Sequence, residues 1–500
     1  MNIIEHLDFG NEAADDVAPE ELSSYFVEQA MFNKFLNKNN KILIATARKG
    51  VGKSALLQWI SHTIHKNDHN ALVIKCRGAD LVRSKFNLTS KLTTPNEYIR
   101  DWMIRLCALV NRQLALTLNM NLKDNEITLD DQITLLETVE LEGYKSRNLI
   151  SCLLDRLLSI FEKRKLTKIP VKNEIEILKR VKNRKVWILI DDLDATYQNT
   201  NIESLELATF FSACRYLGQD LKDTFFRVTM RTDVWAIIRR YDESLDKVEQ
   251  YVNEILWYQR DFLSLLSLRI KASLEALKIP FPKLKANFRI DNKHERFLEL
   301  AFVPKMEWGE KLVDTYKVIY TLSYERPRWA IQLCKLTQEA ALRRRGTLIA
   351  RGDIDEVWGE YGAKRIADLV SEHKHQCPQV QELINAFRGS ERLMSRDDLF
   401  KWINNRVSNH ISPVIEGETT RSPREIARFL YRLGFILARS DSPDGSYEHY
   451  RFDQMPDFLT ARTDEDFTLK WEIHPCYREA LDIKKLDKSH RERFRRLRVD

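Results

Sequence analysis

Two glycines, a lysine and a serine stand between a short apolar run and a helical pattern in the segment KILIATARKGVGKSALLQWI, residues 41–60. A strand, a tight basic loop and a helix in this order can surround a phosphate with backbone N–H groups, because glycine lets the backbone approach without a Cβ clash. Lys53 would place its charge on the phosphates, Ser54 would offer its hydroxyl to Mg²⁺, and the helix start would add partial positive charge. The predicted phosphate-binding residues are Ala47, Arg48, Lys49, Gly50, Val51, Gly52, Lys53 and Ser54.

Two adjacent carboxylates follow a second apolar run, residues 186–190. Such a run predicts a central parallel strand, and its C-terminal end is where ligands bind in open α/β sheets. We predict that Asp191 holds Mg²⁺ through water, since a hard cation prefers oxygen ligands, and that Asp192 is the catalytic base. Because an aspartate reaches less far than a glutamate, we expect slow hydrolysis or a base elsewhere. The alternative is that both carboxylates only end the strand and start a turn.

Two arginines further along the chain lie where they could sense a γ-phosphate. Arg231 follows the apolar run 225–230, so it would sit at the tip of a strand beside the acidic pair. The alternative is an ion pair between Arg231 and Asp233 or a helix carboxylate. Arg328 lies at the start of a predicted helix that opens with proline, and the alternative there is a surface basic pair with Arg326.

The elements that must position these residues alternate between strands and helices. After the first strand, apolar runs and helical periodicity predict strands at 71–76, 186–190, 225–230 and 251–257 and helices at 20–37, 53–66, 95–120, 133–165 and 204–217. This alternation implies parallel βαβ units, and therefore an α/β fold with a parallel sheet. The long interval before the acidic pair indicates a helical insertion at about 85–180.

The C-terminal part of the chain has a different pattern. Ser422, Pro423 and Glu425 are residue types that begin a helix, as its N-cap, first and third residues. That helix would end near Gly434, and alternating segments on either side of 444–445 predict a β-hairpin. Helices followed by a hairpin predict a winged-helix domain, which could bind duplex DNA or contact a protein, and the residues favour neither. Its candidate DNA-contacting arginines are Arg421, Arg424, Arg428, Arg432 and Arg439.

The predicted segments are a helical lead at 1–40, a core at 41–258, a helical lid at 259–366 and the winged-helix domain with a basic tail at 367–500. The tail reads as a solvated helix face, with phosphate contact as the alternative. The net charge of +7 permits contact with nucleic acid without requiring it. No apolar run is long enough to span a membrane, and the seven cysteines include no Cys-x-x-Cys pair, so we expect a cytoplasmic protein with reduced thiols.

In this order, the motifs resemble the AAA+/STAND class of P-loop ATPases, and in particular its KAP-like and origin-recognition-like members. The loop at 47–54, IDDLD at 190–194, RTD at 231–233 and RPR at 326–328 carry the resemblance. It implies a P-loop NTPase fold, a sensor 1 role for Arg231 and a sensor 2 role for Arg328. The sequence departs from the class in having Asp192 where many members carry glutamate. The arginine finger cannot be assigned among Arg215, Arg239 and Arg240.

The resemblance implies a switch that binds ATP and Mg²⁺, hydrolyses ATP to ADP and phosphate, and couples its nucleotide state to a protein effector encoded nearby. A role in bacterial antiviral defence and a homo-oligomeric state are further expectations of this kind. The alternative is an origin-recognition-like DNA-binding ATPase or transcription regulator. We expect residues 378–500 to bind duplex DNA only weakly, because the positive excess of the chain is modest.

Overall fold

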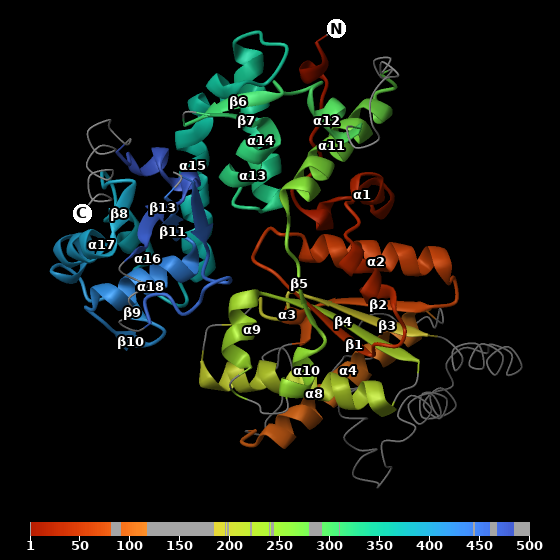
Figure 1. Cartoon of the computed structure of the whole chain (residues 1–500). Coiled ribbons are helices and arrows are strands. Elements are labelled where there is room, and N and C mark those ends of the chain that lie inside the picture. The colour runs from red at the N-terminus through yellow and green to blue at the C-terminus, as the bar shows by residue number, and fades with distance from the viewer. Residues whose placement is uncertain are drawn as a thin grey trace, which may run out of the picture. The chain divides into compact units, whose positions relative to one another are not determined.

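The computed structural model divides the chain into two compact units (Figure 1). The sheet unit is Ala13–Asp261, and the C-terminal unit combines Met1–Glu12 with Phe262–Asp500. The predicted lead at 1–40 is therefore divided between the units, and the predicted segments 259–366 and 367–500 fall almost entirely in one of them. The structure describes residues 2–81, 92–117, 185–195, 197, 200–220, 223–239, 241, 245–279, 293–309, 311–443, 446–460 and 468–484.

A five-stranded sheet with the order β2-β3-β4-β1-β5 forms the centre of the sheet unit. Its strands are β1 (Ile42–Thr46), β2 (Leu72–Arg77), β3 (Val186–Asp191), β4 (Thr224–Met230) and β5 (Val252–Glu254). Every neighbouring pair in this sheet is parallel, which confirms the predicted α/β class. Because the strands are parallel, the carboxyl ends of β1, β3 and β4 meet at one edge of the sheet.

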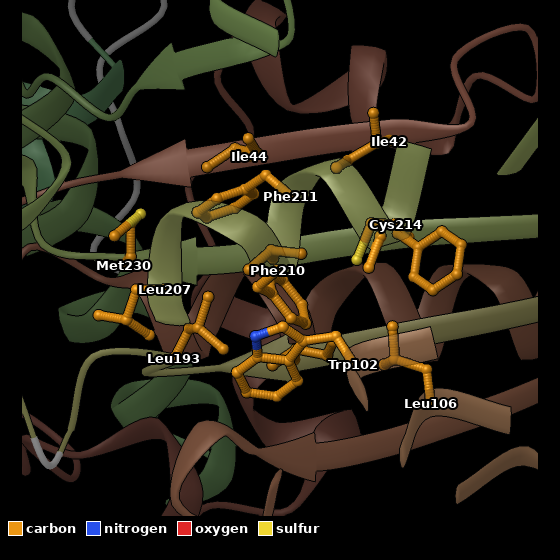
Figure 2. Close-up of a cluster of buried hydrophobic side chains, with 14 of the residues drawn as sticks. Ile42, Ile44, Trp102, Leu106, Leu193, Leu207, Phe210, Phe211, Cys214 and Met230 are labelled. Atoms are coloured by element: carbon orange, nitrogen blue, oxygen red, sulfur yellow. The ribbon is translucent and has the colours of Figure 1, made fainter. Parts of the chain in front are cut away.

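Helices cover both faces of this sheet, with α2 (Lys53–Asn67) on one face and α4 (Pro95–Thr117) and α8 (Asn201–Asp220) on the other (Figure 1). Alternate strand residues point to opposite faces, so Ile42 and Ile44 of β1 lie in the core under α8. Figure 2 shows this apolar cluster gathered around Phe210 and Phe211. The remaining short helices of the unit are η2 (Ala14–Asp16), α1 (Pro19–Tyr25), η3 (Ala30–Leu36), α3 (Gly78–Leu81), α9 (Thr232–Ile238) and α10 (Asp246–Glu249).

The predicted single helix at 20–37 is wrong, because the chain forms α1, then an extended turn, then the 3₁₀ helix η3. The break follows from aromatic packing. Phe26 takes an extended conformation after α1, and its ring stacks on Trp59 of α2 with centroids 5.3 Å apart. Phe32 of η3 packs on the same indole, and one continuous helix could not deliver both rings to it. The predicted helix at 133–165 lies outside the described residues.

The C-terminal unit begins with helices. They are η1 (Ile3–Glu5), α11 (Gln259–Ala276, whose first three residues belong to the sheet unit), α12 (Lys293–Leu298), α13 (Thr315–Leu322), α14 (Pro327–Arg343) and α15 (Arg351–His373), with a hairpin of β6 (Lys305–Trp308) and β7 (Lys311–Asp314). The N-terminal residues are part of this unit. Ile4, Leu7 and Phe9 are buried, Arg269 donates to the Phe9 oxygen at 2.6 Å, and Gln338 donates to the oxygens of Ile4 and Leu7.

A four-stranded antiparallel sheet with the order β12-β11-β13-β8 follows in the same unit. Its strands are β8 (Leu393–Ser395), β11 (Ile436–Asp441), β12 (Tyr447–Tyr450) and β13 (Lys470–Ile473), and the accompanying elements are α16 (Val380–Asn385), α17 (Arg396–Ile403), η8 (Asn404–Ser408), β9 (Val414–Ile415), β10 (Glu418–Thr419), α18 (Pro423–Leu433), η9 (Pro475–Tyr477) and η10 (Glu479–Leu481). The predicted caps of α18 are confirmed. The Ser422 hydroxyl accepts from the Glu425 N–H, and Gly434 ends the helix with a φ of 76°.

The predicted hairpin is confirmed as β11 and β12, whose turn residues 444–445 lie outside the described part of the chain, as do tail residues 485–500. In the part of the chain that is described, no helix is both long and apolar enough to cross a lipid bilayer.

One buried carboxylate, Glu472 of β13, joins basic groups from four segments. It accepts from Arg392 and Arg478 at 2.7 Å, from Arg439 at 3.3 Å, and lies 2.7 Å from His449. Burial raises the pKa of Glu472, but the charge of Arg478, the hydrogen bond with His449 and the charge of Arg392 outweigh burial and hold that pKa well below its ordinary value of 4.5.

We expect Glu472→Gln to lower the stability of the C-terminal unit by about 3 kcal/mol, because it leaves several cations without their shared anion. The folded pKa lies below the unfolded one, so this stabilisation is present above the ordinary carboxyl pKa and is lost as the pH falls below it. The difference between wild type and variant in urea unfolding should therefore shrink in acid. Glu360→Gln, which removes an exposed helix ion pair with Lys364, should change stability by less than about 0.5 kcal/mol. Equal effects of both substitutions would contradict this account.

Candidate nucleotide-binding site

The phosphate loop connects β1 to α2 and uses glycine where the backbone requires it. Gly50 has a φ of 79° and Gly52 a φ of 115°, which side-chain-bearing residues rarely adopt. Gly52 is the N-cap of α2, and its oxygen accepts from the Leu56 N–H at 3.0 Å. The helix thus begins at Lys53, as predicted. Its first backbone N–H groups have no partner within the helix and are available to an anion.

Ala47 is buried, and its N–H donates to the oxygen of Met230 at 3.2 Å. This bond continues the pairing of β1 with β4 by one residue. The buried position between strand and loop explains why a small side chain serves there as well as the glycine of the usual pattern.

The structure brings the loop lysine and the acidic pair together. The Nζ atom of Lys53, whose side chain is only 7% exposed, lies 3.5 Å from Oδ1 of Asp192. The Asp192 side chain is 53% exposed, and its backbone has a φ of 45°, in the left-handed region. Residues other than glycine rarely adopt this backbone conformation, so contacts with surrounding residues must hold Asp192 in it. Residues with such strained backbone angles are concentrated at functional sites.

Thr229 of β4 holds the acidic pair in place. Its hydroxyl donates to Oδ1 of Asp191 at 2.5 Å and accepts from the N–H of Asp192 at 3.0 Å. Thr229 is not among the site residues predicted from the sequence. The sequence does contain one indication of its role, a hydroxyl residue within the apolar strand TFFRVTM. Val228 pairs with Ile190, so the next residue, Thr229, comes to lie beside Asp191.

Gly78 is a second residue near the acidic pair that is not among those predicted from the sequence. A Cβ at this position would lie 2.2 Å from the Leu193 Cα and 2.6 Å from the Asp192 oxygen. Both are main-chain atoms, so neither can move aside cheaply. Glycine directly after β2, at the first residue of α3, therefore lets the turn after the acidic pair pack against the backbone.

The structure gives Arg231 a different partner from those considered above. Its Nε donates to Oδ2 of the buried Asp194, and its backbone N–H donates to Oδ1 of the same carboxylate at 3.1 Å. Asp194 comes from the IDDLD motif, so this pair joins the end of β4 to the turn after β3. The sensor 1 role of Arg231 remains a prediction.

Arg328 lies on α14 in the C-terminal unit, and its sensor 2 role also remains a prediction. The alternative of a surface basic pair is wrong for Arg326, which is buried. Arg326 bonds to Glu372 at 2.9 Å and packs over the ring of Trp329. Of the arginine finger candidates, Arg239 is exposed and pairs with Glu249, Arg215 lies on α8, and Arg240 is outside the described residues.

The groups present fit ATP and Mg²⁺ chemically. Lys53 and the N-terminus of α2 suit phosphate, and the oxygens of Ser54 and Asp191 suit a hard cation. No cluster of three or more His, Cys, Asp or Glu side chains arranged for a metal occurs in the described ranges. Mg²⁺ in nucleotide sites takes only one or two protein ligands, with water and phosphate completing the shell, so this pair of oxygens is sufficient.

The parallel sheet, with its phosphate loop between β1 and α2 and its acidic pair at the end of β3, defines a P-loop NTPase fold. No family model matches the chain. Over 501 residues the chain is 23% identical to the "Putative transposon gamma-delta 80.3 kDa protein" of Escherichia coli (strain K12), an alignment that covers 95% of this chain and 67% of that protein.

Two solved structures are similar at 11% identity. One is the ORC2 protein of Aeropyrum pernix in ADPNP–ADP complexes, with a TM-score of 0.39 over 92% of this chain and 90% of that one. The other is Cdc6p of Pyrobaculum aerophilum, with a TM-score of 0.33 over 93% and 96%. At TM-scores below 0.5 the likeness in fold is weak, and the fold class follows from the sheet and the loop.

Replacing Thr229 with valine should keep the volume of the side chain but remove the hydroxyl that orients Asp191. Loss of such an outer partner typically costs 10–100-fold in metal affinity, so we expect the Mg²⁺-dependent part of ATP binding to weaken by roughly tenfold. Titrations of ATP at several Mg²⁺ concentrations measure this. Thr209→Val is the matched control, because the buried Thr209 hydroxyl donates to the main-chain oxygens of Leu205 and Glu206 within α8. A similar loss in both variants would remove Thr229 from the site.

Proposed function

We propose that the chain binds and slowly hydrolyses ATP and acts as a nucleotide-dependent switch. The observation that carries the proposal is the approach of Lys53 to Asp192, which brings a buried cation, a glycine-shaped loop and an acidic pair to one edge of the sheet. A bound phosphate would replace Asp192 as the anion paired with Lys53, and the Asp192 carboxylate would no longer be engaged in that ion pair. Lys53, Gly50 and Gly52 would therefore hold the phosphates and Asp191 would face the cation.

Hydrolysis would then depend on Asp192. The oxygen of a water attacks the γ-phosphorus, the bond to the β–γ bridging oxygen breaks, and Asp192 accepts the proton of the water. Mg²⁺, when bound, supplies charge stabilisation for the phosphate oxygens. The exposed position of the Asp192 side chain supports access to water, and its short reach supports a slow rate.

The partner of the switch is, in our proposal, a protein that the C-terminal unit contacts. Several arginines considered for DNA contact are already bonded within the unit. Arg432 pairs with Glu416 at 2.9 Å, Arg439 bonds to Asp441 and Glu472, and Arg421 donates to Ser412. These bonds favour a protein partner over DNA for the proposed winged-helix module.

We further propose an accessory role linked to mobile or invading DNA, such as antiviral defence, carried out by the chain as a homo-oligomer. The E. coli relative is named for a transposon, which favours an accessory role of this kind for the present chain. The chemistry proposed for the sheet unit does not depend on this role.

Lys53→Ala should abolish ATP binding, because it removes the only side-chain cation that the described loop buries. In the wild type, ATP·Mg²⁺ at about 100 times its dissociation constant should stabilise the fold by ~2.7 kcal/mol. Thermal unfolding with and without ATP measures both effects. Lys66→Ala, at the exposed end of the same helix, should leave the stabilisation intact. ATP stabilisation that survives in Lys53→Ala would refute the nucleotide site.

Asp192→Asn should preserve Mg²⁺-dependent ATP binding and slow hydrolysis by roughly 10²–10⁴-fold, because it removes a base and leaves Asp191 in place. Asp191→Asn should instead weaken the Mg²⁺-dependent component of binding. Phosphate release and binding titrations on both variants separate the two roles. The reverse pattern would show that the two aspartates exchange roles.

A further inference from the structure

Trp257 contacts the phosphate loop through its side chain. Its indole N–H donates a hydrogen bond of 2.8 Å to the main-chain oxygen of Val51, and both residues are buried. Trp257 lies three residues after the end of β5, and the N–H of Ile255, directly after that strand, donates to the oxygen of Thr46 at 2.8 Å. Strand pairing beside the loop therefore determines where the indole lies. The strand predicted at 251–257 is shorter in the structure, where β5 covers Val252–Glu254 and Trp257 lies beyond it.

The contact fixes the orientation of one peptide group in the loop. The Val51 oxygen and the Gly52 N–H belong to the same planar peptide, and in a trans peptide they point in opposite directions. An oxygen held by the indole therefore turns the Gly52 N–H away from Trp257. Among the described residues, leaving aside Gly52 and its two chain neighbours, no heavy atom lies within 4 Å of the position that a Cβ on Gly52 would take, so the loop is open there.

We propose that Trp257 is a positioning residue for phosphate binding. It holds the Val51–Gly52 peptide in the orientation in which the Gly52 N–H can donate to a nucleotide phosphate. This inference rests on the proposed nucleotide site and adds a residue to it. A loop that contains glycine can adopt many conformations. The hydrogen bond from Trp257 to the Val51 oxygen excludes those in which the Gly52 N–H points away from the ligand.

The hydrogen bond from Trp257 to Val51 also links the loop to residues 255–261, which include the start of α11. Gln29 donates to the oxygen of Leu256 at 3.0 Å and to Oδ2 of Asp261 at 3.4 Å, so residues on both sides of Trp257 are tied to the sheet unit. The Asp261 carboxylate also accepts from the N–H of Tyr258 at 3.1 Å. A phosphate that orders the loop should therefore also order residues 255–261, the last segment of the sheet unit.

Trp257→Phe tests the proposal, since it retains a buried aromatic ring and removes the indole donor. The smaller ring also leaves a cavity, a loss that the control variant shares. We expect affinity for ATP to fall by roughly five- to tenfold, the equivalent of one hydrogen bond. The loss should be equal for ATP and ADP, because the loop holds phosphates that both nucleotides share. Isothermal titration with each nucleotide and Mg²⁺ on the full chain measures these affinities.

Trp102→Phe is the matched control. Trp102 is also buried in the sheet unit, and its indole N–H donates to a main-chain oxygen, that of Glu206, at 2.7 Å. We expect both variants to lose similar thermal stability and only Trp257→Phe to lose nucleotide affinity. Wild-type affinity in Trp257→Phe, together with loss of binding in Lys53→Ala, would overturn the role of Trp257 and leave the proposed function standing. Absence of binding by the wild type would overturn both.

Hydrogen exchange of the wild-type chain tests the proposal even if Trp257→Phe does not fold. ATP should slow amide exchange in peptides covering 50–54 and, to a lesser degree, in those covering 255–261. Protection of the loop with no change at 255–261 would overturn the link through Trp257. Protection of both segments supports it.

Discussion

The parallel pairing of β1 with β4 is the interaction on which the arrangement of the site depends. Its register sets Thr46 opposite Met230, and the bond from Ala47 to Met230 carries the pairing into the phosphate loop. On its other edge β4 pairs with β3, which places Thr229 against Asp191. Strand β4 therefore sets the distance between the loop, which follows β1, and the acidic pair, which ends β3. Main-chain hydrogen bonds within the sheet hold the three strands at that spacing.

A buried arginine of the central strand attaches an irregular segment to this sheet. Arg227 of β4 donates to the main-chain oxygens of Phe35, Asn37 and Asn40, and its guanidinium lies 4.8 Å from the centre of the Trp187 ring. Burial lowers the pKa of Arg227 to about 9, so the group stays charged at neutral pH. A guanidinium group suits this role because it is planar and has several N–H donors. It can therefore bind several carbonyl groups of a segment that is not hydrogen-bonded as a strand of the sheet.

Local patterns predicted much of the fold and part of the candidate site. The loop glycines, the start of α2 at Lys53 and the caps of α18 depend on neighbouring residues, so residue types and spacing were enough to find them. The contacts of Thr229, Gly78 and Trp257 depend on strand register and on approaches between distant segments. Their residue types are compatible with ordinary core positions, so no spacing in the sequence distinguishes them.

The partner of Arg231 illustrates the same limit. An arginine at a strand tip can reach a ligand or a carboxylate, and only the position of Asp194 on the neighbouring strand's turn decides which group is nearest. The break in the predicted helix at 20–37 has a similar origin. Phe26 and Phe32 both pack on the indole of Trp59 in α2. Helical periodicity along the sequence does not show that both rings contact the same side chain.

The chain passes between the two units twice, between Glu12 and Ala13 and again between Asp261 and Phe262. A fragment that starts at residue 262 would therefore lack Ile4, Leu7 and Phe9 and would leave Arg269 and Gln338 without the main-chain oxygens they bind. To isolate this half of the molecule, residues 2–12 must be supplied as a separate peptide or joined to the fragment by a linker. A fusion or tag at the N-terminus would likewise be attached to the half of the protein that contains the C-terminus.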